Sequence, residues 1–77
     1  MYKLSMTYYY TAKDPATNKP LATGIVVTKD EQAAKREITN ALPKTSAYRK
    51  GHRNFDVEFS GNKGLFAAHA FTYRGVA

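Results

Sequence analysis

The sequence contains no cysteine, which excludes disulfide bonds and thiolate metal sites. A chain of 77 residues buries only roughly two thirds of the surface that its unfolded form exposes, so its fold must rest on packing and backbone pairing alone. The first ten residues lack the apolar run and small-residue cleavage site of a signal peptide, and no stretch approaches the length of a membrane span. We therefore expect one soluble domain over residues 1–77 in a reducing cytoplasm.

The chain also lacks a recognisable catalytic or metal-binding motif. Asp56 and Glu58 stand two residues apart in a predicted strand and point the same way, but such pairs more often solubilise a sheet surface or pair with lysine across strands. His52 and His69 have no carboxylate at the spacing of a triad or a metal site. We expect that the protein is not an enzyme and needs no cofactor and no metal.

Acidic residues are scarce, since six Asp and Glu stand against twelve Lys and Arg, for a net charge of +6 and a pI near 9.7. Hydrophobic residues make up 43% of the chain and charged residues 23%, which is the composition of an ordered globular protein. The positive balance favours anionic partners. We expect nucleic acid or an acidic protein face, and no membrane.

Four segments are predicted to be strands. Residues 2–11 and 54–60 alternate between apolar and polar side chains with a period of two, and residues 21–28 contain the β-branched run Ile-Val-Val. Residues 65–74 form a fourth strand with two fairly apolar faces, which indicates a central strand or an edge strand that meets a partner. The Pro-, Asp- and Asn-containing residues 13–20 predict a long hairpin loop, and Gly24 predicts a bulge or a close approach.

One helix is predicted between the second and third strands. Thr28 and Glu31 have the spacing of a capping box, and Pro43 ends the helical pattern. One narrow apolar stripe faces the core, made of Ala34, Ile38, Ala41 and Leu42. The order strand, strand, helix, strand, strand predicts an α+β two-layer sandwich, a ββαββ fold with a mainly antiparallel four-stranded sheet in the order 2-1-3-4. The single helix leaves one sheet face open.

Residues 44–53 concentrate the positive charge. They include four of the twelve basic residues and no acidic one, and without them the chain would hold eight basic side chains against six acidic ones. We interpret this basic segment as a loop from helix to strand that contacts phosphate groups, since Lys and Arg displace condensed counterions. The alternative is that the loop is simply solvated. Tyr48 could stack on a base or pack against the sheet. The predicted contacts are Arg49, Lys50 and Arg53 as anchors, Lys35, Arg36 and Lys44 as flanking charges, and Tyr48 and Tyr9 as packing or stacking residues.

The element order, with the helix entry Thr-Lys-Asp-Glu-Gln-Ala-Ala-Lys-Arg after the second strand, resembles small bacteriophage proteins that disable host machinery. Anti-CRISPR proteins that attach to the Cascade surveillance complex include similar compact folds. The resemblance implies an inhibitor in the host cytoplasm that blocks a nucleic-acid site by steric or electrostatic occlusion. Because this chain is basic and not an acidic DNA mimic, the resemblance implies that the inhibitor contacts acidic protein patches, guide RNA or DNA.

The sequence thus predicts a non-enzymatic binding module, an anti-CRISPR-like inhibitor that docks on a host nucleoprotein complex. The alternative is a stand-alone, nonspecific DNA- or RNA-binding protein. A third class is an oligomer that assembles on an exposed strand edge.

Overall fold

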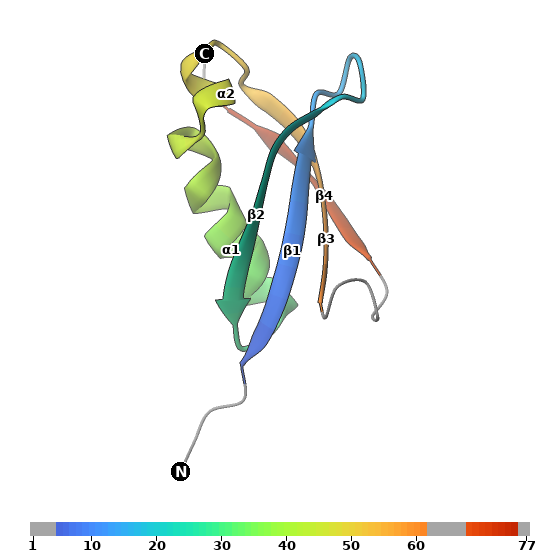
Figure 1. Cartoon of the computed structure of the whole chain (residues 1–77), viewed down its shortest axis with the longest axis vertical. Coiled ribbons are helices and arrows are strands. Elements are labelled where there is room, and N and C mark those ends of the chain that lie inside the picture. Colours follow the sequence, from blue (N-terminus) through green and yellow to red (C-terminus); the bar gives the residue numbers. More distant parts are fainter. Residues whose placement is uncertain (1–4, 62–67, 76–77) are drawn as a thin grey trace.

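The computed structural model describes residues 5–61 and 68–75 (Figure 1). These residues form four strands, one long helix and two short helical turns. The elements in chain order are β1 (Met6–Lys13), β2 (Pro20–Thr28), α1 (Glu31–Ala41), the 3-10 turn η1 (Leu42–Lys44), α2 (Ser46–Arg49), β3 (Asn54–Gly61) and β4 (His69–Arg74). No helix within these residues is long and apolar enough to cross a membrane.

The four strands form one antiparallel sheet in the order β2-β1-β3-β4. This confirms the predicted compact α+β fold and the predicted strand order. Tyr9 in the middle of β1 lies opposite Ile25 of β2 on one side and Ser60 of β3 on the other. The central strands are therefore β1 and β3, and β4 is an edge strand.

The two faces of the sheet differ because side chains alternate along each strand. Helix α1 covers one face (Figure 1) and contributes Ala34 and Ile38 to the core, while Leu42 of η1 follows them. The strands contribute the buried residues Tyr8, Tyr10, Ala12, Phe55, Val57 and Phe59. The predicted helix stripe is confirmed at Ala34, Ile38 and Leu42, whereas Ala41 is only half-buried.

Several strand boundaries differ from the prediction. β1 runs from Met6 to Lys13, so it extends two residues further than expected towards the hairpin loop. β4 begins at His69, and Ala68 before it is not in a strand. The predicted starts of the first and fourth strands, residues 2–4 and 65–67, lie outside the described residues.

The predicted capping box is wrong. Asp30, and not Thr28, is the N-cap of α1: its backbone is extended and its Oδ1 accepts a hydrogen bond from the Ala33 amide at 2.8 Å. The Thr28 hydroxyl instead donates a hydrogen bond to the Asp30 carbonyl at 2.9 Å, which helps to fix the position of the cap residue. A carboxylate at the helix start also interacts favourably with the helix dipole.

Gly24 is a close-approach point, as predicted. It lies opposite Tyr10 in the sheet, and a Cβ atom at this position would stand 2.6 Å from the Tyr10 ring. The absence of a side chain at Gly24 therefore leaves room for the buried Tyr10 ring. The requirement for glycine here comes from packing.

Candidate partner-binding surface

Half of the basic segment, residues 44–53, is helical, with Lys44 in η1 and Ser46–Arg49 in α2, so the prediction of a plain loop is wrong. Thr45 is the N-cap of α2, and its Oγ1 accepts a hydrogen bond from the Tyr48 amide at 3.2 Å. The same hydroxyl donates to the Leu42 carbonyl at the end of η1, at 2.7 Å. One threonine therefore joins two helical turns and fixes the direction in which α2 leaves the core.

Gly51 ends α2. Its φ of 114° is positive, and its amide donates to the Tyr48 carbonyl at 3.1 Å. The next amide, of His52, donates to the Ala47 carbonyl at 3.1 Å. These two bonds are the pair that defines a Schellman motif, in which glycine is favoured at the left-handed position.

The side chains of α2 and of its C-cap residue Lys50 fall into an inner and an outer set. Ala47 is buried and Tyr48 packs against the hydrophobic core. Arg49 and Lys50 lie on the outside and are exposed to solvent. Of the alternatives for Tyr48, the structure shows packing against the core.

Arg53 does not extend freely into solvent. Its guanidinium carbon lies 4.1 Å from the centre of the Tyr48 ring, and its Nη1 donates to the Tyr48 carbonyl. The side chain is half-buried, and its second contact is with the His52 carbonyl at 3.4 Å. Arg53 therefore closes the turn after α2, while the rest of its guanidinium keeps donors that can meet an anion.

The fold brings further cations to the same end of the molecule. The β1–β2 hairpin loop, α2 and the last residue of β4 lie together there (Figure 1). Asp14, Pro15 and Ala16 of the loop line a shallow depression with His52, Arg53, Asn54 and Arg74. The loop also carries the exposed Lys19. We call the cations gathered here the cationic end: Lys19, Arg49, Lys50, Arg53 and Arg74.

Sequence reasoning missed Lys19 and Arg74 because they lie far along the chain from the basic segment. A signal for Arg74 was present, since the predicted antiparallel pairing of the last two strands brings the end of one beside the start of the other. In the structure Arg74 is indeed opposite Asn54, the first residue of β3. Asp14 is the one carboxylate that lines the depression, and its Oδ1 accepts a hydrogen bond from the Ala16 amide at 2.9 Å.

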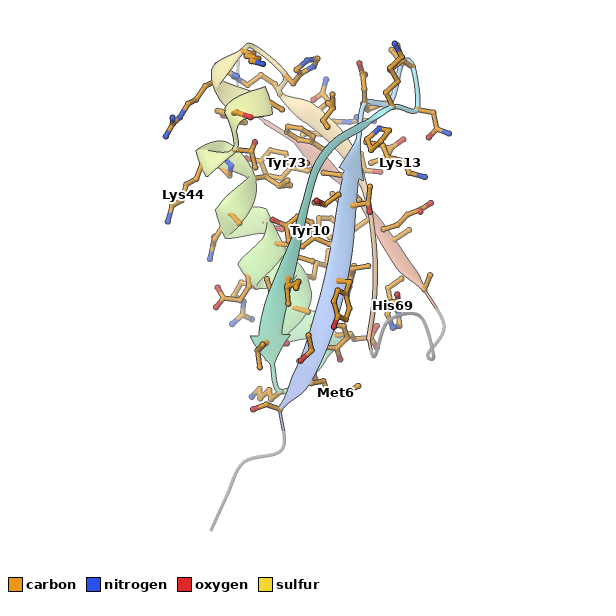
Figure 2. The ribbon with its side chains drawn as sticks, in the orientation of Figure 1. Met6, Tyr10, Lys13, Lys44, His69 and Tyr73 are labelled. Carbon is orange, nitrogen blue, oxygen red and sulfur yellow. The ribbon has the colours of Figure 1, made fainter. Side chains whose placement is uncertain are left out.

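The other predicted contact residues are not gathered at this end. The Lys35 ammonium lies 5.3 Å from the centre of the Phe71 ring, so it spans the gap between α1 and β4. Arg36 is exposed on α1. Lys44 of η1 is exposed and extends outward from the helical side (Figure 2), and it lines a groove together with residues 25–27 of β2. Tyr9 is half-buried on the open sheet face, which is the face away from α1.

The open sheet face combines apolar and acidic residues. Ile25 and Val27 of β2 are 59% and 63% exposed. On β3 the Glu58 carboxylate pairs with the Lys13 ammonium at 3.3 Å, and Asp56 lies opposite Lys13 in the register. The expected role of these carboxylates as cross-strand partners of lysine is confirmed for Glu58. Their negative charge makes this face unsuited to phosphate.

His69 connects the sheet to the helix. Its Nδ1 lies 2.8 Å from the Glu31 Oε2, and its ring packs 5.3 Å from that of Phe59. Nearby, burial raises the pKa of the Tyr8 phenol, and the Asp30 and Glu31 carboxylates add to the effect. Within residues 5–61 and 68–75, no three His, Asp or Glu side chains come together as a metal site would require.

No protein-family model, curated protein or solved structure matches this chain. Its function is therefore inferred from its own side chains, and the cationic end is the feature with the clearest chemistry.

Proposed function

We propose that this protein is a non-enzymatic binding module that docks through its cationic end on a host nucleoprotein complex and blocks or alters the nucleic-acid binding of that complex. The observation that carries the proposal is that α2 with the turn after it, the β1–β2 hairpin loop and the end of β4, which together carry the five cations, lie at one end of the fold (Figure 1), where Arg53 and Arg74 line one depression. The compact ββαββ architecture is also that expected of a phage-type, anti-CRISPR-like inhibitor. The chemistry offered to the partner is a set of guanidinium and ammonium groups that match phosphate oxygens.

The exposed members of this set are the natural contacts. These are Lys19, Arg49, Lys50 and Arg74, whereas Arg53 is partly used inside the fold. Simultaneous contact of about four cations with phosphates predicts a fall in affinity of about a hundredfold as salt rises from 50 to 200 mM. Such contacts position a protein on a nucleic acid and do not read its sequence.

The test compares two variants that lose the same number of charges. The first replaces Arg49, Lys50 and Arg74 by alanine, and the control replaces Lys29, Lys35 and Arg36 by alanine. Lys29 lies with Met6 at the opposite end of β1, so the control removes charge from elsewhere. Each protein is immobilised and used to capture complexes from a bacterial lysate, with and without nuclease treatment.

We expect the wild type and the control variant to capture a nucleoprotein complex, and the first variant to lose it. Equal loss in both variants would show that net charge alone matters and would reject the cationic end as the docking site. Capture of nothing by the wild type would reject the proposal itself.

The second candidate, a stand-alone nucleic-acid-binding protein, uses the same cationic end on free nucleic acid. Fluorescence anisotropy of a labelled random duplex and a labelled single-stranded RNA separates the two functions. Micromolar binding by the isolated protein with a steep salt dependence favours the stand-alone function. Weak binding to both probes, together with capture of a complex from lysate, favours docking on a nucleoprotein.

A further inference from the structure

The outer edge of β2 lacks the features that usually protect an edge strand. β2 is the last strand on its side of the sheet, so the backbone groups along its outer edge have no ladder partner among the described residues. Edge strands commonly carry a lysine, an internal proline or a bulge that prevents pairing with another strand. The stretch Ile25, Val26, Val27 carries none of these, because the one irregularity of β2 lies at its far end, beside Pro20.

The same stretch exposes apolar surface. Ile25 and Val27, on the open sheet face, are the only exposed large hydrophobic residues among those that the structure describes. Val26 between them points to the helix side and is half-buried. An unpaired edge and exposed β-branched side chains thus coincide in three consecutive residues, which suits the addition of another strand.

Helix α1 adds a charged rim to this edge. Of the strands, β2 is the one that α1 packs against most closely, and a groove runs between them. Its β2 wall is Ile25, Val26 and Val27, and its helical wall is Glu37, Asn40, Ala41 and Lys44. Glu37 and Lys44 are both exposed and stand on either side of Asn40 and Ala41. The rim therefore has a negative group at one end and a positive group at the other.

The edge of β2 and its charged rim are self-complementary under a two-fold rotation. A two-fold axis perpendicular to the sheet, beside Val26 and midway between the two strands, would place a second β2 antiparallel to the first, with Ile25 of each copy opposite Val27 of the other. The same rotation would place both helices on the same side of the joined sheet, running in opposite directions. Glu37 of each copy would then face Lys44 of the other. One axis satisfies both the apolar pairs and the charge pairs.

We propose that a second copy of this chain pairs with the edge of β2, so that two four-stranded sheets join into one continuous antiparallel sheet. The self-complementary charge rim favours a second copy over an extended segment of another protein, which would have no reason to match Glu37 and Lys44 in reverse order. The cationic end is not part of this interface. The two proposals can therefore fail separately.

The first test measures mass in solution. Light scattering coupled to size exclusion, repeated over a wide range of concentrations, should show the mass rise from that of the 8.6 kDa chain towards twice that value. Val27→Lys places a charge on the exposed face of the edge and should keep the protein monomeric. Thr72→Lys is the matched control, since Thr72 is exposed on the edge strand β4 at the other side of the sheet. It should dimerise as the wild type does.

The second test exchanges the charges and does not depend on the apolar residues. Glu37→Lys alone would put two lysines face to face at both ends of the interface, and Lys44→Glu alone would put two glutamates there. Each single variant should raise the dimer dissociation constant by about tenfold. An equimolar mixture of the two variants, or the double variant, should recover the wild-type constant because every facing pair is again of opposite charge.

A wild type that stays monomeric at all concentrations would overturn the proposal. A dimer that Val27→Lys and Thr72→Lys leave equally intact would also overturn it, because the interface would then lie elsewhere. Failure of the mixture to recover the wild-type constant would reject the two-fold arrangement. Circular dichroism of each variant confirms that it is folded.

Discussion

The guanidinium of Arg53 stacks on the ring of Tyr48, 4.1 Å from its centre, and donates a hydrogen bond to the carbonyl of the same tyrosine. Tyr48 in turn packs against the hydrophobic core. Arg53 is thereby linked to the core through one residue, although it belongs to the most basic segment of the chain. Within this segment, the exposed charges that we propose as partner contacts and a charge that stabilises the fold stand only a few residues apart.

Because Arg53 contacts the fold and Arg49 does not, alanine substitutions of these two arginines should differ in their effect on stability. Arg53→Ala should lower the free energy of unfolding by about 1 to 2 kcal/mol, because it removes the stacking contact and leaves the Tyr48 carbonyl without its charged donor. Arg49→Ala should change stability by less than about 0.5 kcal/mol, as is usual for an exposed side chain. Urea unfolding followed by circular dichroism measures both. Equal effects would mean that the Arg53 contact contributes nothing to the fold.

The charge pattern alone places Arg53 with Arg49 and Lys50 as an anchor for a partner. Charge density does not tell which side chain turns back onto its own backbone. That depends on α2, and α2 has only four residues, too few for hydrophobic periodicity to reveal it. The local signals were present, however: a threonine at the start of the turn and a glycine just after its end.

Substitution of Gly51 tests whether the turn that ends α2 stabilises the fold at the cationic end. Its positive φ strains any residue with a Cβ, while nothing lies within 4 Å of where that Cβ would be. Gly51→Ala should therefore lower the free energy of unfolding by about 1 kcal/mol through backbone strain alone. Ser46→Ala, at an exposed position of the same turn, is the control and should be near neutral. Thermal unfolding of the two variants gives the comparison, and a neutral Gly51→Ala would show that the turn relaxes without loss.

The sheet and α1 were predictable because their patterns are long. Alternation over residues 54–60 and the helical spacing of Ala34, Ile38 and Leu42 each repeat several times, so the buried faces follow from geometry. The N-cap was not predictable with the same accuracy, because Thr28 and Asp30 are both good caps and only their backbone angles decide. The place of Arg74 beside Asn54 follows from the predicted pairing of the last two strands, whereas the place of Lys19 at the same end required the arrangement of the whole sheet.

The helix stripe leads to a prediction for Ile38, which is fully buried at 0% exposure and packs in the core between α1 and the sheet. Ile38→Ala should lower the free energy of unfolding by about 2 to 5 kcal/mol through the lost burial and the cavity left behind. Arg36→Ala, two residues earlier on the exposed side of α1, should have little effect. Chemical denaturation reports both values. A near-neutral Ile38→Ala would contradict the assignment of the buried helix face.

Tyr8 leads to a prediction at alkaline pH. Burial raises the pKa of its phenol above 10.0, the ordinary value that we take for the unfolded chain, and the Asp30 and Glu31 carboxylates raise it further. Between these two pKa values the unfolded state loses its proton while the folded state keeps it. The stability that Tyr8 contributes is therefore complete below pH 10 and is lost as the pH rises through the folded pKa.

The free energy of unfolding, measured in urea as the pH is raised from neutral, should consequently fall above pH 10. Tyr8→Phe removes the ionisable group and should make this fall shallower. Tyr9→Phe is the matched control, because Tyr9 is the next residue of β1 but points to the open face. It should keep the wild-type slope. An unchanged slope in Tyr8→Phe would show that the buried phenol does not govern alkaline unfolding, and that other groups with altered proton affinity do.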